Sequence, residues 1–154
     1  LRDVADMRTR IASQKSADNN WSLKYLRGGI LDIEFILQYL ALRYAAVRPE
    51  ILANNTSDLM KNLTRYGYLK VPTSRLLGEA LDLFQALQGV FTITNEGEIT
   101  SIQVRYFSNS LKNYLTRVGG GANFSSIEAK VQNLASDVYE IYKEIIDCPA
   151  AKLN

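Results

Sequence analysis

The stretch that decides the fold runs from Arg27 to Phe35 and reads Arg-Gly-Gly-Ile-Leu-Asp-Ile-Glu-Phe. Two glycines stand directly before an apolar segment with helical character, a cation precedes them, and two carboxylates follow. A helix that begins at Ile30 would present unpaired N–H groups and partial positive charge beside Gly28 and Gly29. Because glycine lacks a Cβ, a ligand or another segment of backbone can approach closely there. The stretch therefore indicates either an anion site or a close packing contact.

The two carboxylates, Asp32 and Glu34, cannot act on one ion if both are helical. Helical residues two positions apart are rotated by about 200° and point to nearly opposite sides. A partly buried Glu34 would need a cation, and Lys24 and Arg27 are the local candidates. Asp32 falls in the first turn, where it also compensates the helix dipole. We expect one carboxylate in a structural ion pair and the other at an interface.

The sequence lacks the groups that most catalytic and metal sites need. It has no histidine and a single cysteine, Cys148, which strongly disfavours a structural zinc site and excludes a Ser-His-Asp mechanism within this chain. A Walker loop and a Rossmann fingerprint are also missing around Gly28. Any metal would be a hard ion such as magnesium on oxygen ligands. We therefore expect no catalytic residue and no metal ligand.

The composition also indicates which classes of binding partner are to be expected. The chain has 154 residues, enough for one domain with a sizeable core, and a net charge of +2 from 18 basic and 16 acidic residues. This balance does not favour nucleic-acid binding, which needs a concentrated basic face. No apolar run approaches the roughly 18 residues of a membrane span. We therefore expect neither a nucleic acid nor a membrane among the partners.

The rest of the chain is helical in pattern, so the sequence predicts an all-α bundle of about six helices with short connections. Apolar periodicity predicts helices over residues 2–15, 30–46, 56–67, 73–92, 100–118 and from 125 to at least 145. The first carries the apolar stripe Val4, Met7 and Ile11, and the last carries a heptad seam. Trp21–Leu26 alternates and is expected to be extended, Pro49–Ala53 to be a helical turn, and Asn95–Glu98 a turn.

Short polar residues predict where these helices begin. The expected N-caps are Thr56, Thr73, Thr100 with Gln103, and Ser125 with Glu128. Gly67 and the run Gly119–Gly121 are expected to end helices, because glycine readily takes the left-handed conformation. Each of the prolines Pro49, Pro72 and Pro149 is expected where a helix begins or ends.

From Trp21 to Phe35 the chain reads Trp-Ser-Leu-Lys-Tyr-Leu-Arg-Gly-Gly-Ile-Leu-Asp-Ile-Glu-Phe. This resembles the Trp-x-Leu/Val-Lys-x-x-x-Gly-Gly-x-x-Asp-Ile-Glu-Phe stretch of the glutamine synthetase adenylyltransferase family. The resemblance continues through Gln38–Leu40 and Pro49–Leu52 ahead of Asn55 and Thr56, is dense to about Gly67, and is looser near Leu87 and Gln88. In that family the stretch follows the second nucleotidyltransferase domain.

The resemblance implies a large, bifunctional, cytoplasmic bacterial enzyme of nitrogen metabolism. Such an enzyme adds AMP from ATP to a tyrosine of glutamine synthetase, and its other half removes it. Magnesium, the PII signal protein and glutamine control the balance. The family's catalytic Gly-Ser and Asp-x-Asp motifs do not occur in this sequence. Residues 1–154 are therefore expected to be one helical, C-terminal domain behind the nucleotidyltransferase domain, without ATP, Mg²⁺ or AMP transfer of its own.

Several roles for such a domain remain open at this point. Residues near the nucleotide or at an interface are expected to be Lys24, Arg27, Gly28, Gly29, Asp32 and Glu34. The alternatives are a regulatory module that binds PII or glutamine, a bundle from a related uridylyltransferase, and a purely structural brace. The chain starts at Leu1 inside a helical pattern, so we expect a piece of a longer protein rather than a trimmed whole one.

Overall fold

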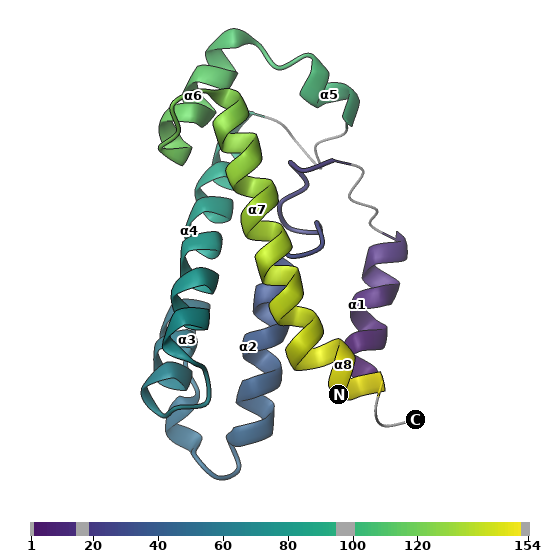
Figure 1. Ribbon diagram of the computed structural model, residues 1–154, viewed down its shortest axis with the longest axis vertical. Helices are drawn as coiled ribbons and strands as arrows, with labels where there is room; N and C mark the ends of the chain where they lie inside the picture. Colours follow the sequence, from purple (N-terminus) through teal and green to yellow (C-terminus); the bar gives the residue numbers. More distant parts are fainter. Residues whose placement is uncertain (1, 15–18, 95–100, 152–154) are drawn as a thin grey trace.

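The computed structural model describes residues 2–14, 19–94 and 101–151 (Figure 1). Every regular element in these ranges is helical and none is a strand, so the predicted all-α fold is confirmed. The elements are α1 (Arg2–Gln14), α2 (Ile30–Tyr44), η1 (Pro49–Ile51), α3 (Thr56–Arg65), α4 (Val71–Thr94), α5 (Ser101–Arg105), α6 (Asn109–Gly119), α7 (Phe124–Tyr142), η2 (Lys143–Asp147) and α8 (Cys148–Ala151). Within the described part, no helix is both long enough and apolar enough to cross a membrane.

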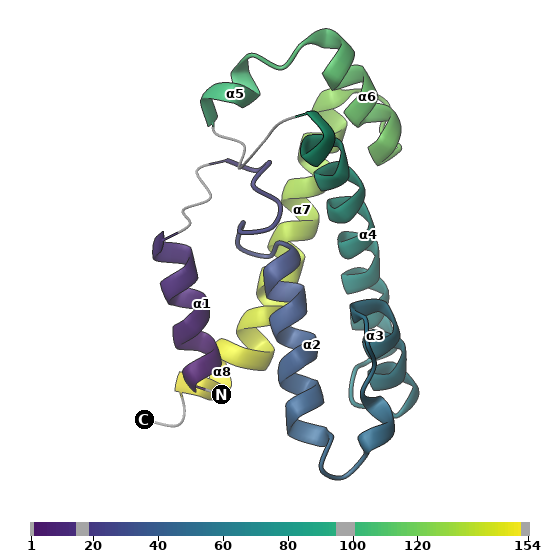
Figure 2. The same ribbon diagram turned by 180° about the vertical axis from the view of Figure 1, so that it is seen from behind.

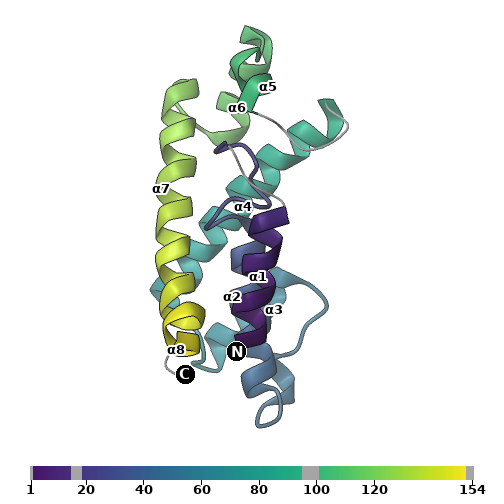
Figure 3. The same ribbon diagram turned by 90° about the vertical axis from the view of Figure 1, so that its right-hand side faces the viewer.

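Three long helices, α2, α4 and α7, pack against one another and form the centre of the bundle. α3 packs on α2 and α4 at one end, and α6 packs on α4 and α7 at the other (Figures 1 and 2). α1 runs alongside α2 and also contacts η2 and α8, as Figure 3 shows from the side. The first helix of the chain therefore packs against its last helical segments.

The core is made by the apolar stripes that periodicity predicts. Ile33, Ile36 and Leu37 of α2 are fully buried, as are the following residues of α4 and α7: Leu77, Phe84, Leu87, Ile127 and Val138. The predicted stripe of α1 is wrong at Met7, whose side chain is 57% exposed, while its neighbour Arg8 is fully buried. Hydrophobic periodicity misses this because the group that α1 buries is charged.

Several helix starts differ from the prediction by one or two residues. Asn55, not Thr56, caps α3, and its side chain accepts the N–H of Asp58 at 2.8 Å. α4 begins at Val71, before Pro72 and Thr73, because proline in a first turn lacks only an N–H that the helix does not use. Asn123 and Ser126 form the capping box of α7 in place of Ser125 and Glu128. The N-cap is the residue with extended backbone directly before the helix. Where two nearby residues can both cap, the sequence does not show which of them takes that position.

The predicted helix over residues 100–118 is two helices, α5 and α6. The chain leaves the helical path at Phe107, and the Ser108 hydroxyl then accepts the N–H of Leu111 at 3.2 Å to cap α6. Phe107 is buried against the rings of Trp21, Phe91 and Phe124. Burial of this aromatic ring outweighs the continuity of the helix. Lys15, the predicted cap Thr100 and the predicted turn Asn95–Glu98 lie outside the described residues.

The segment Trp21–Leu26 forms turns and is not extended. Tyr25 and Leu26 both donate their N–H groups to the carbonyl of Ser22, at 2.9 and 2.8 Å. Trp21 and Leu23 are buried, and the Trp21 ring stacks on Phe124 with centroids 5.2 Å apart. The alternation therefore reflects the burial of Trp21 and Leu23 in a loop. The backbone of this loop forms local hydrogen bonds and does not pair with a strand in the described part of the chain.

Two glycines end helices as predicted, and the prolines Pro49 and Pro149 lie at helix starts. Gly67 and Gly120 have φ of +79° and +67° and terminate α3 and α6. Pro49 is the first residue of η1, which ends at Ile51 and is therefore shorter than the predicted turn Pro49–Ala53. Pro149 is the second residue of α8, so it lies where a helix begins, and α8 follows α7 directly through a π-helical turn, η2. The N–H of Cys148 bonds to the carbonyl of Lys143, and this wider turn relieves the clash of a proline ring with the preceding turn.

Candidate functional site

Both glycines are buried, Gly28 against α7 and Gly29 against the backbone of its own loop. A Cβ at Gly28 would lie 1.7 Å from the carbonyl oxygen of Ala135 in α7, and a Cβ at Gly29 would lie 2.3 Å from the carbonyl oxygen of Leu23. Gly28 also has a φ of +77°, a conformation that other residues rarely adopt. Of the two uses predicted for the glycines, the structure shows the close packing contact: the loop before α2 crosses α7 backbone to backbone.

The N–H groups at the start of α2 are paired with acceptors of the chain itself. The pairs are Gly28 with Asp32 Oδ2 at 2.5 Å, Gly29 with Leu26 O at 2.8 Å, Ile30 with Leu23 O at 3.0 Å, and Leu31 with Lys24 O at 3.2 Å. An anion at a helix N-terminus binds to N–H groups that are free to point at it. In this conformation such a ligand would have to displace these bonds.

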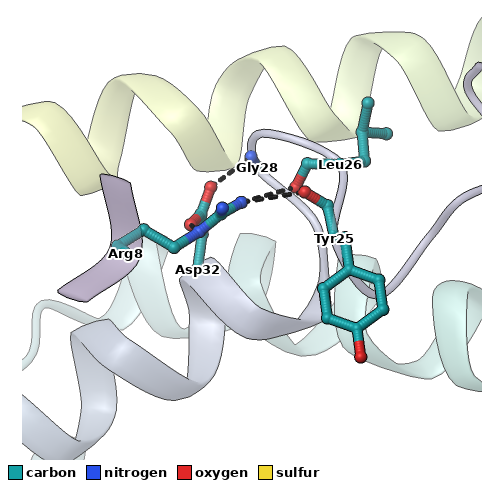
Figure 4. A network of polar contacts seen from close by, with 5 residues as sticks. All are labelled: Arg8, Tyr25, Leu26, Gly28 and Asp32. Carbon is teal, nitrogen blue, oxygen red and sulfur yellow. Dashed lines mark hydrogen bonds and ion pairs between the residues drawn. The ribbon is translucent and has the colours of Figure 1, made fainter. Parts of the chain in front are cut away.

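Asp32 is the centre of a buried polar network that Figure 4 shows. Its carboxylate forms an ion pair with Nε of Arg8 from α1, and both side chains have no exposed surface. The second guanidinium nitrogen of Arg8, Nη2, donates to the carbonyls of Tyr25 and Leu26 at 3.0 and 3.2 Å. Together with the bond from Gly28 to Asp32, these contacts join α1, the glycine loop and α2; we call this set of groups the interlock.

One carboxylate, that of Asp32, is therefore in a buried ion pair, as predicted, and its cation is Arg8. Lys24 and Arg27, the candidate cations for Glu34, make no ion pair with it within the described ranges. Lys24 is exposed and lies 5.5 Å from the ring of Tyr25, and Arg27 lies 5.5 Å from the ring of Tyr139 in α7. Glu34 is half-buried and makes no ion pair within the described ranges. Arg8 stands 24 residues before Asp32, so local spacing gives no signal of the pairing.

A further set of polar groups surrounds the interlock. Arg8 Nη1 and the hydroxyl of Tyr142 are buried without a hydrogen-bond partner among the described residues. Burial raises the pKa of the Tyr142 phenol, and the carboxylates of Asp147 and Asp32 raise it further. Burial also raises the pKa of Asp147 in the π turn, while the charge of Arg27 opposes this shift. The interlock thus lies close to the partly buried charges of Arg27 and Asp147 next to the π turn.

The chemistry open to this arrangement is limited. It has no histidine, no thiol and no activated hydroxyl, and the carboxylate of Asp32 is already held by Arg8 and Gly28. Across the described residues, no group of three His, Cys, Asp or Glu side chains could hold a metal ion. Of the six predicted site residues, Gly28, Gly29 and Asp32 are buried, and Lys24, Arg27 and Glu34 remain at least partly exposed. The buried three make contacts inside the fold, whereas Lys24, Arg27 and Glu34 keep some exposed surface.

The sequence of this chain is similar to a segment of known, much longer proteins. The chain is 36% identical over 144 residues to the bifunctional glutamine synthetase adenylyltransferase/adenylyl-removing enzyme of Rhodopseudomonas palustris strain TIE-1. The proteins of the same description from Bradyrhizobium diazoefficiens and Xanthobacter autotrophicus are 32% and 30% identical over 145 and 148 residues. The chain is homologous to a segment of glutamine synthetase adenylyltransferases. The resemblance of the Trp21–Phe35 stretch is thereby confirmed.

The match covers nearly all of this chain but a small part of each adenylyltransferase. In the three comparisons 94%, 94% and 96% of the chain is aligned, and the chain spans 14%, 14% and 15% of its relatives' lengths. No family model matches the chain. No solved structure matches it either.

Replacement of Gly28 tests whether the loop must touch α7. Gly28→Ala adds a Cβ that would collide with the backbone of Ala135, and we expect it to lower the free energy of unfolding by at least about 4 kcal/mol. Gly67→Ala is the matched control, because Gly67 has the same sign of φ but nothing within 4 Å of the added Cβ. It should cost only the backbone strain, about 1–2 kcal/mol. Equal losses of stability in urea unfolding would contradict the contact.

A double-mutant cycle tests the buried ion pair. Arg8→Met or Asp32→Leu alone leaves one buried charge without its partner and should cost about 3–5 kcal/mol of unfolding free energy. The double variant removes both charges, so its loss should be clearly smaller than the sum of the single losses. Urea unfolding of all four proteins measures the coupling. Additive losses would show that Arg8 and Asp32 act independently.

Proposed function

We propose that this chain is a helical domain of a bifunctional glutamine synthetase adenylyltransferase/adenylyl-removing enzyme, and that it supports the adenylyltransferase active site without carrying the chemistry. We place it after the second nucleotidyltransferase domain, as the C-terminal domain. The proposal rests on where the residues of the Trp21–Phe35 stretch lie. Gly28, Gly29 and Asp32 are buried at the interlock, whereas Lys24 and Glu34 lie beside it and keep exposed surface.

The residues of this chain do not fit the ATP and Mg²⁺ that the family implies. Magnesium prefers carboxylate oxygens free to coordinate, and Asp32 already accepts from Arg8 and Gly28. The sequence also lacks the Gly-Ser and Asp-x-Asp motifs of the catalytic fold. In this proposal nucleotide and metal are held by other parts of the enzyme, in the bacterial cytoplasm. The PII protein and glutamine act on the whole enzyme.

A rigid domain next to an active site can contribute by positioning. Small displacements of a reacting group lower rates strongly, so a brace that fixes the neighbouring domain has a measurable effect. The interlock provides the rigidity, because it ties α1 to the rest of the bundle. The exposed Lys24 and the half-buried, unpaired Glu34 provide polar groups for the contact with the nucleotidyltransferase domain.

The test uses the full-length enzyme with the paired change Lys24→Ala and Glu34→Ala. We expect the kcat/KM of adenylylation to fall about tenfold. Deadenylylation should keep its rate, and the melting temperature should stay within about 2 °C, since neither side chain supports the core. Arg75→Ala with Asp82→Ala on α4 is the control, because it removes the same two charges from exposed positions. Unchanged adenylylation in the Lys24 and Glu34 variant would contradict the proposal.

A further inference from the structure

A second polar surface lies at the end of the bundle away from the interlock. It combines the last turns of α2 and the turn after it with the end of α3 and the segment that follows, toward the lower end of the molecule in Figures 1 and 2. We call this surface the tyrosine–arginine tip, formed by Tyr39, Arg43, Tyr44, Arg48, Arg65, Tyr66 and Tyr68. None of these residues takes part in the contacts around Gly28.

The arginines of the tip are held on tyrosine rings. Arg43 donates to the hydroxyl of Tyr39 at 2.7 Å, and its guanidinium lies 5.5 Å from the ring centre of Tyr44. The Tyr44 ring stacks on that of Tyr68 with centroids 4.2 Å apart, which joins the two segments. A guanidinium that already lies on a ring loses less freedom when it binds a partner, so the tip is organised before binding.

A second pair of arginines meets at one ring. Arg48 and Arg65 lie 5.1 and 5.8 Å from the ring centre of Tyr66. Like charges gathered in this way repel each other unless an anion lies nearby. Arg48 has Glu50 at 3.7 Å, with both side chains about half exposed. For Arg43 and Arg65 the described part of the chain offers no carboxylate partner, so the tip carries an excess of positive charge.

Exposed apolar side chains accompany this charge. Leu42 and Val47, on the last turn of α2 and the turn after it, are each 77% exposed. Tyrosine and arginine are the residues that most often dominate binding at protein interfaces, and apolar neighbours exclude water from such contacts. Two copies of the tip facing each other would place arginines against arginines, which disfavours self-association through this surface.

We propose that the tyrosine–arginine tip docks an acidic, partly apolar surface of the protein substrate. Carboxylates of the partner would bind Arg43 and Arg65, since guanidinium and carboxylate pair through two parallel hydrogen bonds. The apolar part of the partner would cover Leu42 and Val47. The choice of glutamine synthetase as the partner rests on the function proposed above, whereas the acidic character of the partner rests on the tip alone.

The experiment measures binding of the full-length enzyme to immobilised glutamine synthetase. Arg43→Glu with Arg65→Glu reverses the two unpaired charges, and we expect the Kd to rise about tenfold and its salt dependence to weaken. Arg105→Glu with Arg117→Glu is the matched control, because both arginines are exposed on α5 and α6 at the other end. The control should change the Kd by less than about twofold.

Each outcome decides the proposal. Steady-state adenylylation should show a raised KM for glutamine synthetase and an unchanged kcat in the tip variant, because the tip binds and does not position the reacting groups. A tip variant with the original melting temperature and the original Kd would overturn the docking surface. So would equal losses in the tip and control variants, which would indicate a general charge effect. A fall in kcat with an unchanged Kd would mean that the tip contacts the enzyme's own domains. The variants at Lys24 and Glu34 test the supporting role separately, since they are scored on turnover.

Discussion

The buried ion pair between Arg8 and Asp32 is the interaction on which the arrangement of the other elements depends. Removing two charges from water costs several kcal/mol for each ion. The attraction between the charges offsets this cost only when the remaining polar atoms of both groups are also hydrogen-bonded. Arg8 meets this condition in part through the carbonyls of Tyr25 and Leu26, and Asp32 through the N–H of Gly28. The pair is thus more important for specifying where α1 and the glycine loop lie than for adding net stability.

The glycine loop and the ion pair depend on each other. Gly28 can offer its N–H to Asp32 only with its left-handed φ, and it can lie against Ala135 only without a side chain. This places α2 next to α7 and brings the π turn, with Asp147, close to the charges of Arg27 and Asp32. The stretch from Arg27 to Phe35 is therefore a packing junction inside the fold, in which Gly28, Gly29 and Asp32 are buried.

The sequence predicted the helices better than the contacts between them. Apolar periodicity found the buried faces of α2, α4 and α7, because burial of those faces is local information. It failed at Met7 and Arg8, where a charge faces inward. It predicted the burial of Phe107 correctly but not the break between α5 and α6 at that residue. Helix geometry correctly placed Asp32 and Glu34 on different sides of α2, but nothing in the local sequence indicated that Arg8 of α1 would pair with Asp32. The tyrosine–arginine tip was missed because its members come from two segments that only the fold brings together.

The most direct test of this account is native-state hydrogen exchange on the 154-residue chain. If the interlock holds α1 to the bundle, the amide of Gly28 and the amides of α1 should exchange through the same opening, with free energies close to those of α2. Arg8→Met should then increase exchange in α1 and at Gly28 well before it does so in α4. Free exchange throughout α1 in the unaltered chain, with Gly28 still protected, would contradict the claim that the ion pair joins them.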